Sequence, residues 1–361
     1  MALTSVCIVC RSHPSVAALR HVMLNIDAFL DPSSEWTIPD ACRFGSVRLL
    51  DRIEFRAKVN GDSTIKCVRS QRGFQNGVMK AMECGHLEVV QWLVAKFPDG
   101  KVPSNAVATS AKNGHLAVLR WLFDHHDHVY WGGDEMYCAV AHNHLKVAKF
   151  LHAYTSPPSD EMFLIDEAAQ HGDLEMMQWL HRERGDQLSY EGVMRAVDHG
   201  LLDTVKWMQD TFPGSVVIKD VRMDNAAANG HLDMVKWLQN QHAWCTKQAM
   251  NRAAGNGHLD VVKFLDESRS EGCTTDAMDL AAGSGHLGVV KWLHNNRSEG
   301  CTQFAMDLAA KNGFLGMMKW LHAHRSEGCT QAAMMDAVSN GHFEVCSWLR
   351  ETYPGKFDLA L

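Results

Sequence analysis

Apolar and polar residues along most of the chain follow a pattern that repeats about every 28 residues. The string Asn-Gly-His-Leu marks the period at 113–116, 229–232 and 256–259, and weaker copies lie between and beyond these. The position of its glycine serves as an anchor for eleven units: Gly45, Gly85, Gly114, Asn143, Gly172, Gly200, Gly230, Gly257, Gly285, Gly313 and Gly341. Nine of the ten spacings between anchors are 27–30 residues. This regularity predicts an array of stacked repeats rather than one compact core.

Each unit contains two apolar stripes at helical spacing. Before the anchor, position −7 is always apolar and position −4 is Ala in ten of the eleven units, so −7, −4 and −3 predict the buried side of a first helix. After the anchor, apolar residues at +2, +4, +5, +7 and +8 predict a second helix. The anchor lies in the turn between them, where a left-handed backbone favours Gly, with Asn143 as the best substitute. Four threonines are expected to be N-caps of first helices: Thr246, Thr274, Thr302 and Thr330.

One of these units shows the resemblance to a known family most clearly. Residues 253–265, Ala-Ala-Gly-Asn-Gly-His-Leu-Asp-Val-Val-Lys-Phe-Leu, resemble the core of the ankyrin repeat, and the resemblance covers roughly residues 35–350. It implies an all-α, ankyrin-like solenoid of about eleven helix pairs. The units are shorter than the 33-residue ankyrin repeat, and the missing residues fall between units, so the β-hairpin fingers are expected to be shortened or absent. Shortened arrays of this kind are similar to those common in oomycetes.

Three regions are predicted from the limits of the repeat. Residues 1–34 form an N-terminal segment with an amphipathic capping helix over 15–29, because a terminal repeat must have its apolar face covered. Residues 35–349 form the repeat array, with an extra loop at about 55–73 that accounts for the 40-residue spacing. Residues 350–361 form a C-terminal tail.

Composition narrows the possible partners. The 361 residues are 46% hydrophobic with a net charge of −7, and this mild acidity argues against general affinity for nucleic acid or anionic membrane. No apolar run approaches the length of a membrane span. The eleven cysteines and the absence of a convincing secretion signal indicate reduced thiols in the cytoplasm or nucleus.

Histidines and cysteines suggest several candidate chemical sites. Each histidine after an anchor is expected to tie the turn between helices through backbone hydrogen bonds. Cys7-x-x-Cys10 with His13 and His21 has half of a zinc-site spacing, and His125–His128 is the densest cluster of potential ligands. The sequence contains neither a phosphate-binding loop nor a His-Glu-x-x-His motif. We therefore expect no catalytic residue, no metal and no cofactor.

A partner is expected to bind where repeats differ from one another. Positions −5 and −2 vary between units and share one face of the first helix, which the resemblance places on the concave side. The partner-binding candidates are Glu167, Gln170, Arg195, Asp198, Asn225, Arg252, Leu280, Leu308 and Lys311. The aromatic row at +7, mostly Trp, is instead interpreted as packing between repeats, with buried indoles.

The leading hypothesis is a non-catalytic, monomeric scaffold that binds another protein across this face. One alternative is a metal-dependent protein that uses the N-terminal Cys/His segment or the His125–His128 loop. Another alternative is an effector that acts inside a host cell.

Overall fold

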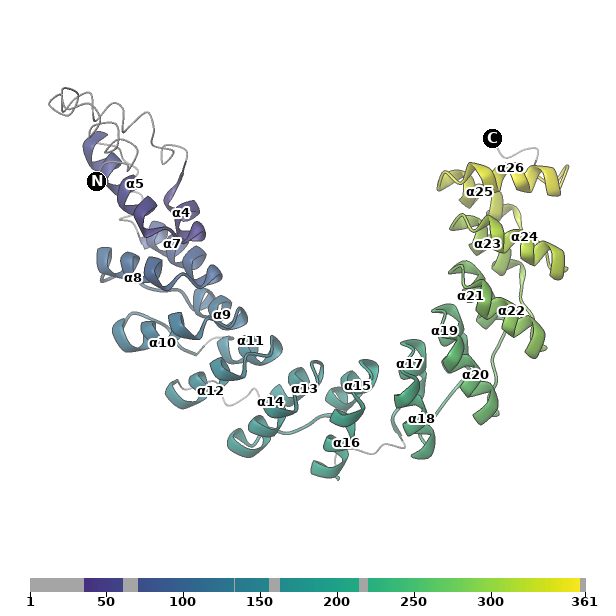
Figure 1. Ribbon diagram of the computed structural model, residues 1–361, viewed down its shortest axis with the longest axis horizontal. Coiled ribbons are helices and arrows are strands. Elements are labelled where there is room, and N and C mark those ends of the chain that lie inside the picture. The colour runs from purple at the N-terminus through teal and green to yellow at the C-terminus, as the bar shows by residue number, and fades with distance from the viewer. Residues whose placement is uncertain (1–35, 61–70, 133, 156–162, 214–219, 358–361) are drawn as a thin grey trace, which may run out of the picture. The chain divides into compact units, whose positions relative to one another are not determined.

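The computed structural model describes residues 36–60, 71–132, 134–155, 163–213 and 220–357 (Figure 1). The chain divides into two units, which are described separately. Unit one comprises residues 1–164 and 178–186, and unit two comprises 165–177 and 187–361. Within the described residues there are 22 α-helices and one π-helical turn, and the described residues form no β-strand.

The helices fall into eleven consecutive pairs, one for each predicted repeat. The pairs of repeats 1 to 5 are α4 (Ile38–Phe44) and α5 (Val47–Asn60), α7 (Gln71–Cys84) and α8 (Leu87–Lys96), α9 (Ser104–Lys112) and α10 (Leu116–His125), α11 (Glu135–Ala141) and α12 (Leu145–Tyr154), and α13 (Leu164–Ala169) and α14 (Leu174–Trp179), the last continued by the π-helical η2 (Leu180–Arg184). The pairs of repeats 6 to 11 are α15 (Tyr190–Asp198) and α16 (Leu202–Thr211), α17 (Met223–Ala228) and α18 (Leu232–Asn240), α19 (Lys247–Gly255) and α20 (Leu259–Ser268), α21 (Asp276–Gly283) and α22 (Leu287–Asn296), α23 (Gln303–Lys311) and α24 (Leu315–His324), and α25 (Gln331–Ser339) and α26 (Phe343–Thr352). The predicted all-α repeat array is confirmed.

Within unit two, the first helices α17, α19, α21, α23 and α25 stack in one row (Figure 1). The second helices α18, α20, α22, α24 and α26 form a second row. Where ankyrin fingers would stand, the described residues contain only two isolated bridges, Val102 with Val129 and Arg222 with Trp244. The connections between repeats are therefore loops with little sheet structure.

The anchor turn has the backbone that the sequence predicts. Gly257 has φ +85° and Gly285 has φ +80°, both left-handed. Asn143, the single non-glycine anchor, has φ +61°. The left-handed turn therefore favours Gly at every anchor, and Asn costs less there than any other non-glycine residue.

The core lies along the two predicted stripes, except at the aromatic row. In repeat 9, Met278, Ala281 and Ala282 of α21 and Val290 and Leu293 of α22 are all at most 1% exposed. The tryptophans at +7 are half-buried rather than fully buried. They still pack between repeats as predicted: Trp320 meets His294 of the preceding repeat edge to face, with ring centroids 5.3 Å apart.

The histidines after the anchor hold the turns through backbone hydrogen bonds, as predicted: the N–H of His115 donates to the carbonyl of Ser110 at 3.0 Å. Their rings bond to the preceding repeat. His115 Nε2 donates to the carbonyl of Glu83 at 3.1 Å, and Asn113 Nδ2 donates to the same carbonyl at 2.9 Å. His231 and Asn229 repeat this arrangement on the carbonyl of Asp198, at 3.0 and 2.7 Å. The ring bonds therefore join consecutive repeats, in addition to the backbone bonds that close each turn.

The predicted threonine caps also join repeats. Thr302 Oγ1 accepts from the N–H of Phe304, as a helix N-cap does, at 3.1 Å. The same threonine donates its N–H and its hydroxyl to the carboxylate of Asp279 in the preceding repeat, at 2.7 and 2.6 Å. Equivalent clamps join Thr246 to Asp224 and Thr330 to Asp307. The prediction for Thr274 is off by one residue, because Thr275 is the N-cap of α21. Thr274 Oγ1 still accepts from the N–H of Asp276 at 3.2 Å, and Thr274 pairs with Asn251 of the preceding repeat.

The predicted regions outside the array are only partly described. The N-terminal segment 1–34 lies outside the described residues, as do 358–361. Helix α5 continues to Asn60 and α7 begins at Gln71, so helices occupy both ends of the stretch 55–73 that was expected to be a loop. In the tail, Lys356 Nζ donates to the carbonyl of Cys329 at 2.5 Å, and Phe357 is 2% exposed.

Candidate protein-binding surface

All nine candidate partner-binding residues lie in unit two, in or directly after the first helices. Positions −5 and −2 are one helical turn apart and follow a third position, −9, on the same side of the helix. We call the surface formed by positions −9, −5 and −2 of α15, α19, α21 and α23 the first-helix face. Its residues are Glu191, Arg195, Asp198, Gln248, Arg252, Gly255, Asp276, Leu280, Gly283, Phe304, Leu308 and Lys311.

The N-terminal part of the candidate set is used to hold repeats 5 and 6 together. Arg195 Nη1 donates to Glu167 Oε1 at 2.6 Å, and Arg195 Nε lies 3.6 Å from Glu191 Oε1. This hydrogen bond to the Glu167 carboxylate raises the pKa of Arg195 above its ordinary value. Glu167 and Arg195 therefore contribute to the array itself, and reversing either charge would disturb a contact between repeats.

Asp198 also serves the contact with the next repeat, through its backbone carbonyl. Its Oδ1 is buried and has no hydrogen-bond partner among the described residues. Asn225 in α17 is half-buried, whereas Gln170, which follows α13, is exposed.

The C-terminal part of the set lies over glycines of the preceding helix. A Cβ at Gly255 would lie 2.9 Å from Cβ of Leu280, and a Cβ at Gly283 would lie 2.8 Å from Cβ of Leu308. Glycine at position −2 therefore lets consecutive first helices approach closely. Even so, Leu280 remains 41% exposed and Leu308 is half-buried.

One residue of this surface is absent from the sequence-based set. Phe304 is 66% exposed, more than Leu280, and lies one turn before Leu308 on α23. The spacing 304, 308 and 311 places Phe304, Leu308 and Lys311 on one side of the helix, and this i, i+4, i+7 pattern could have identified Phe304. The predicted set contains residues at positions −5 and −2 only, so it lacks Phe304 at position −9.

Basic side chains lie beside this apolar strip. Arg252 and Lys311 are exposed, and neither side chain has a hydrogen bond or ion pair within the described parts of the chain. Exposed apolar side chains beside free basic groups are typical of protein-recognition surfaces.

The candidate metal ligands do not converge on one point. His125 stacks on Trp121 with ring centroids 5.1 Å apart and bonds to the Trp121 carbonyl. His126 is 6% exposed and its Nε2 donates to the carbonyl of Gly100 at 2.8 Å. Among the described residues, no three His, Cys, Asp or Glu side chains are placed to hold one ion. Cys7, Cys10, His13 and His21 lie outside the described residues.

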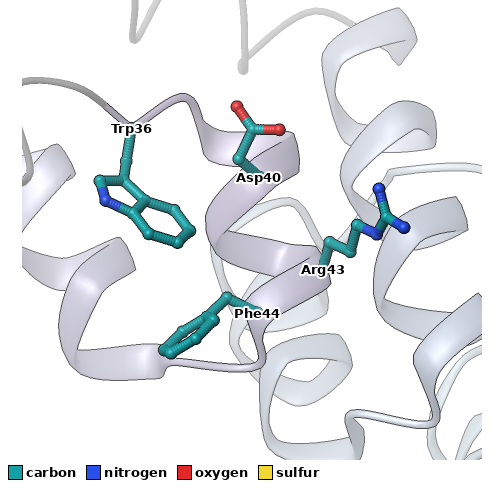
Figure 2. Close-up of a pocket in the computed structure, with 4 residues that line it drawn as sticks. All are labelled: Trp36, Asp40, Arg43 and Phe44. Atoms are coloured by element: carbon teal, nitrogen blue, oxygen red, sulfur yellow. The ribbon is translucent and has the colours of Figure 1, made fainter.

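A second surface feature lies at the start of the described chain. Trp36, Asp40, Arg43 and Phe44 line an open depression on α4, with the two rings on one side of the helix (Figure 2). The ring centroids are 5.2 Å apart with an interplanar angle of 62°. The depression is open and Phe44 is 66% exposed, so it is a surface hollow rather than an enclosed ligand site.

The eight described cysteines are unpaired, and most are buried. Burial raises the pKa of Cys42 to about 12 and that of Cys273 to about 11. A thiol with a raised pKa is protonated at neutral pH and is a poor nucleophile or metal ligand.

In the described part of the chain, no helix has the length and apolar character needed to cross a membrane.

Comparison with known families identifies the C-terminal repeats. Residues 223–303 and 278–358 match the family model described as ankyrin repeats (3 copies). The first match begins at the first residue of α17, the second begins within α21, and together they span repeats 7 to 11. None of the curated proteins matches the chain.

Proposed function

Because this chain is an ankyrin repeat protein, we propose that it is a non-catalytic scaffold that binds another protein along its first-helix face. Ankyrin repeats are generally protein–protein interaction modules. The observation that carries the proposal is the exposed apolar strip of Leu280, Phe304 and Leu308, flanked by Arg252 and Lys311. A partner that covers Phe304 would gain about 1.5–3 kcal/mol from that side chain alone.

The kind of partner follows from the chemistry of the strip. Apolar side chains of the partner would cover Leu280 and Phe304, and carboxylates would pair with the two free basic groups. The mechanism is the rigid presentation of side chains on stacked helices, with no chemical step. The unpaired cysteines suit a reducing compartment, so we place this function in the cytoplasm or nucleus.

The test is affinity capture from cell lysate followed by binding measurements on the purified partner. One bait is wild type, and the second carries Arg252→Glu, Phe304→Asp and Lys311→Glu, which alters the first-helix face without touching the Glu167–Arg195 pair. The control bait carries Lys263→Glu, Lys291→Glu and Lys319→Gln, on the second helices of repeats 8, 9 and 10. Both variants add the same negative charge and change exposed side chains.

A partner held by wild type and control, and bound at least tenfold more weakly by the face variant, supports the proposal. A partner held equally by all three baits places the binding surface elsewhere. Circular dichroism of each bait verifies that the helices are intact.

A further inference from the structure

Repeats 3 and 4 carry an exposed cluster of aromatic rings. We call it the aromatic patch; its members are Phe123 of α10, Trp131 of the loop after α10, and Phe150 and Tyr154 of α12. Phe123 is 37% exposed, Tyr154 is 56% exposed and Trp131 is half-buried, whereas Phe150 is buried. The ring of Phe123 meets each of the other three rings edge to face, with centroids 5.6–6.0 Å apart. The patch is therefore continuous, and it lies within unit one.

The stacking of repeats does not require rings at these positions. Phe123 occupies position +9, and in repeats 6 to 10 this position is polar: Gln209, Gln239, Asp266, His294 and His322. Tyr154 occupies position +11, which in the same repeats is also polar: Thr211, Gln241, Ser268, Asn296 and His324. A contiguous exposed apolar surface usually marks an interaction site. The patch therefore indicates binding rather than packing between repeats.

The loop that carries Trp131 is held by hydrogen bonds on both sides of the ring. Before it, the N–H of Val102 donates to the carbonyl of His128 at 3.0 Å, and Val102 forms a bridge with Val129. After it, the N–H of Gly132 donates to Glu135 Oε1 at 2.7 Å. Because the loop is already ordered, a ligand of the patch has little loop ordering to offset.

The charges around the patch favour a cation. Asp124 directly follows Phe123, and Asp127 and Asp134 lie in the same loop as Trp131. All three side chains are exposed, and none has a hydrogen bond or ion pair within the described ranges. Phe123 and Tyr154 also lie in the last turns of α10 and α12, where the helix dipole is negative.

The chain already places guanidinium groups over aromatic rings. Arg120 Cζ lies 5.9 Å from the centroid of Phe150, within the patch itself. In unit two, Arg222 Cζ lies 5.4 Å from the centroid of Trp244. Within the described part of the chain, no cation lies over Trp131 or Tyr154. These two rings are therefore available to a cation from another molecule.

The basic groups of the same helices do not neutralise this end of the patch. Arg120 of α10 and Lys146 and Lys149 of α12 precede the last residues of these helices by about a turn or more. Asp124, Asp127 and Asp134 instead lie at the end of α10 and in the loop that follows it. The charged rim beside Trp131 is therefore acidic.

We propose that the aromatic patch binds an arginine-containing segment of a partner protein. Guanidinium groups of the segment stack on Trp131 and Tyr154 and pair with the neighbouring carboxylates, such as Asp124. The preference is opposite to that of the first-helix face, which offers free basic groups and suits an acidic partner. The patch is thus a second binding surface, for a partner of a different charge.

Calorimetric titration of the full chain with two synthetic peptides tests this preference. One peptide contains Gly, Ser and Arg, and the other has Lys in place of every Arg. We expect saturable binding of the arginine peptide and binding of the lysine peptide about threefold weaker or more. Trp131→Ser and Tyr154→Ser, measured separately, should each weaken arginine-peptide binding about threefold. Tyr190→Ser is the matched control, because Tyr190 is 48% exposed but lies in unit two. It should leave the affinity unchanged.

A second variant tests the acidic rim. Asp124→Asn, Asp127→Asn and Asp134→Asn combined should weaken arginine-peptide binding and reduce its dependence on salt, because charge pairs near the surface are screened by salt. An affinity and a salt dependence unchanged in this variant would contradict the role of the carboxylates. Helical content and urea midpoints of every variant separate lost binding from lost folding.

Several results would overturn the proposal. The arginine peptide fails to saturate, or both ring variants bind it as tightly as wild type does. Equal affinity for the lysine peptide would show only a general attraction of cations to a chain of net charge −7. An uncharged, proline-rich peptide that binds more tightly than the arginine peptide would assign the patch to another class of partner. Binding at the first-helix face is measured with variants at Arg252, Phe304 and Lys311, so either proposal can fail alone.

Discussion

The imidazole of His286 packs against Gly257 of the preceding repeat, where a Cβ would meet the ring at 2.7 Å. The same glycine has a left-handed backbone, with φ +85°. Two independent requirements, backbone conformation and space for the next histidine, therefore select glycine at the same position. The repeated Gly-His pair is a contact between neighbouring repeats as well as a turn.

Replacing Gly257 by Ala should be more costly than the same change at Gly341. Gly257→Ala adds both a left-handed alanine, about 1–2 kcal/mol, and a clash that overpacks the interface, about 1–3 kcal/mol. Gly341→Ala adds only the first cost, since nothing lies within 4 Å of its Cβ position. Urea unfolding followed by helical signal compares the two. Equal destabilisation would mean that His286 moves aside freely and that backbone conformation alone selects this glycine.

The sequence predicts the features that lie within one repeat, but not the contacts between repeats. The period, the paired stripes and the anchors predict the eleven helix pairs because each is a local pattern that recurs. The partners of His115 and Thr302 could not be predicted, because they lie one repeat away, at Glu83 and Asp279. The sequence shows which residues recur but not which neighbour each one contacts.

The candidate surface was predicted only in part for a similar reason. Variation between repeats located the correct helices, yet Glu167 and Arg195 vary while pairing with each other across an interface. Trp320 looked like a core residue at helical spacing, but the edge of the second-helix row leaves it half-buried. Phe55 lay in an expected loop, although its helix α5 extends to Asn60. Burial depends on the neighbouring repeat, which a pattern within one repeat does not describe.

The clamp between Asp279 and Thr302 should tolerate an amide better than a methyl group. Asp279→Ala leaves the N–H and hydroxyl of Thr302 without their partner and should cost about 1.5–3 kcal/mol, the range for hydrogen bonds to charged groups. Asp279→Asn should cost less than about 1 kcal/mol, because Asn251 already makes both bonds to Thr274, at 2.9 and 2.8 Å. Hydrogen exchange of the amides in α21 and α23 would locate the loss. An asparagine variant as unstable as the alanine variant would show that the charge itself is needed.

The same carboxylate should make this interface sensitive to pH. Burial raises the pKa of Asp279 above its ordinary value of 3.8, so the folded chain keeps this proton to a higher pH than the unfolded chain does. Its contribution to stability is therefore fully present below pH 3.8 and is lost as the pH rises through the folded pKa. Compared with Asp279→Asn, which does not titrate, the wild type should lose stability over that window. Urea titrations of both proteins at several pH values measure the difference, and parallel curves would contradict the assignment.

Glu299 should have the opposite dependence. Its hydrogen bond with Arg297, at 2.5 Å, lowers the pKa of Glu299 from 4.5 to about 2. Arg297, directly after α22, also donates to Asp266 of α20 in the preceding repeat at 2.8 Å and lies over Gly272. It therefore joins the loop after α22 to α20 and to the loop after α20. The contribution of Glu299 is present above pH 4.5 and is lost as the pH falls toward 2.

Glu299→Gln should therefore remove part of the acid-induced loss of stability. The variant should be less stable than wild type at pH 7, and the gap should close as the pH falls from 4.5 toward 2. Glu271→Gln is a matched control from the preceding copy of the same Arg-Ser-Glu-Gly loop, where Arg269 donates to Glu271 at 2.9 Å and shares its guanidinium with Gln239. Because the Arg269–Glu271 bond is longer than the Arg297–Glu299 bond, Glu271→Gln should cost less stability than Glu299→Gln at pH 7. A gap in Glu299→Gln that stays constant from pH 7 to pH 2 would show that the Arg297 pair stabilises the loop by packing rather than by charge.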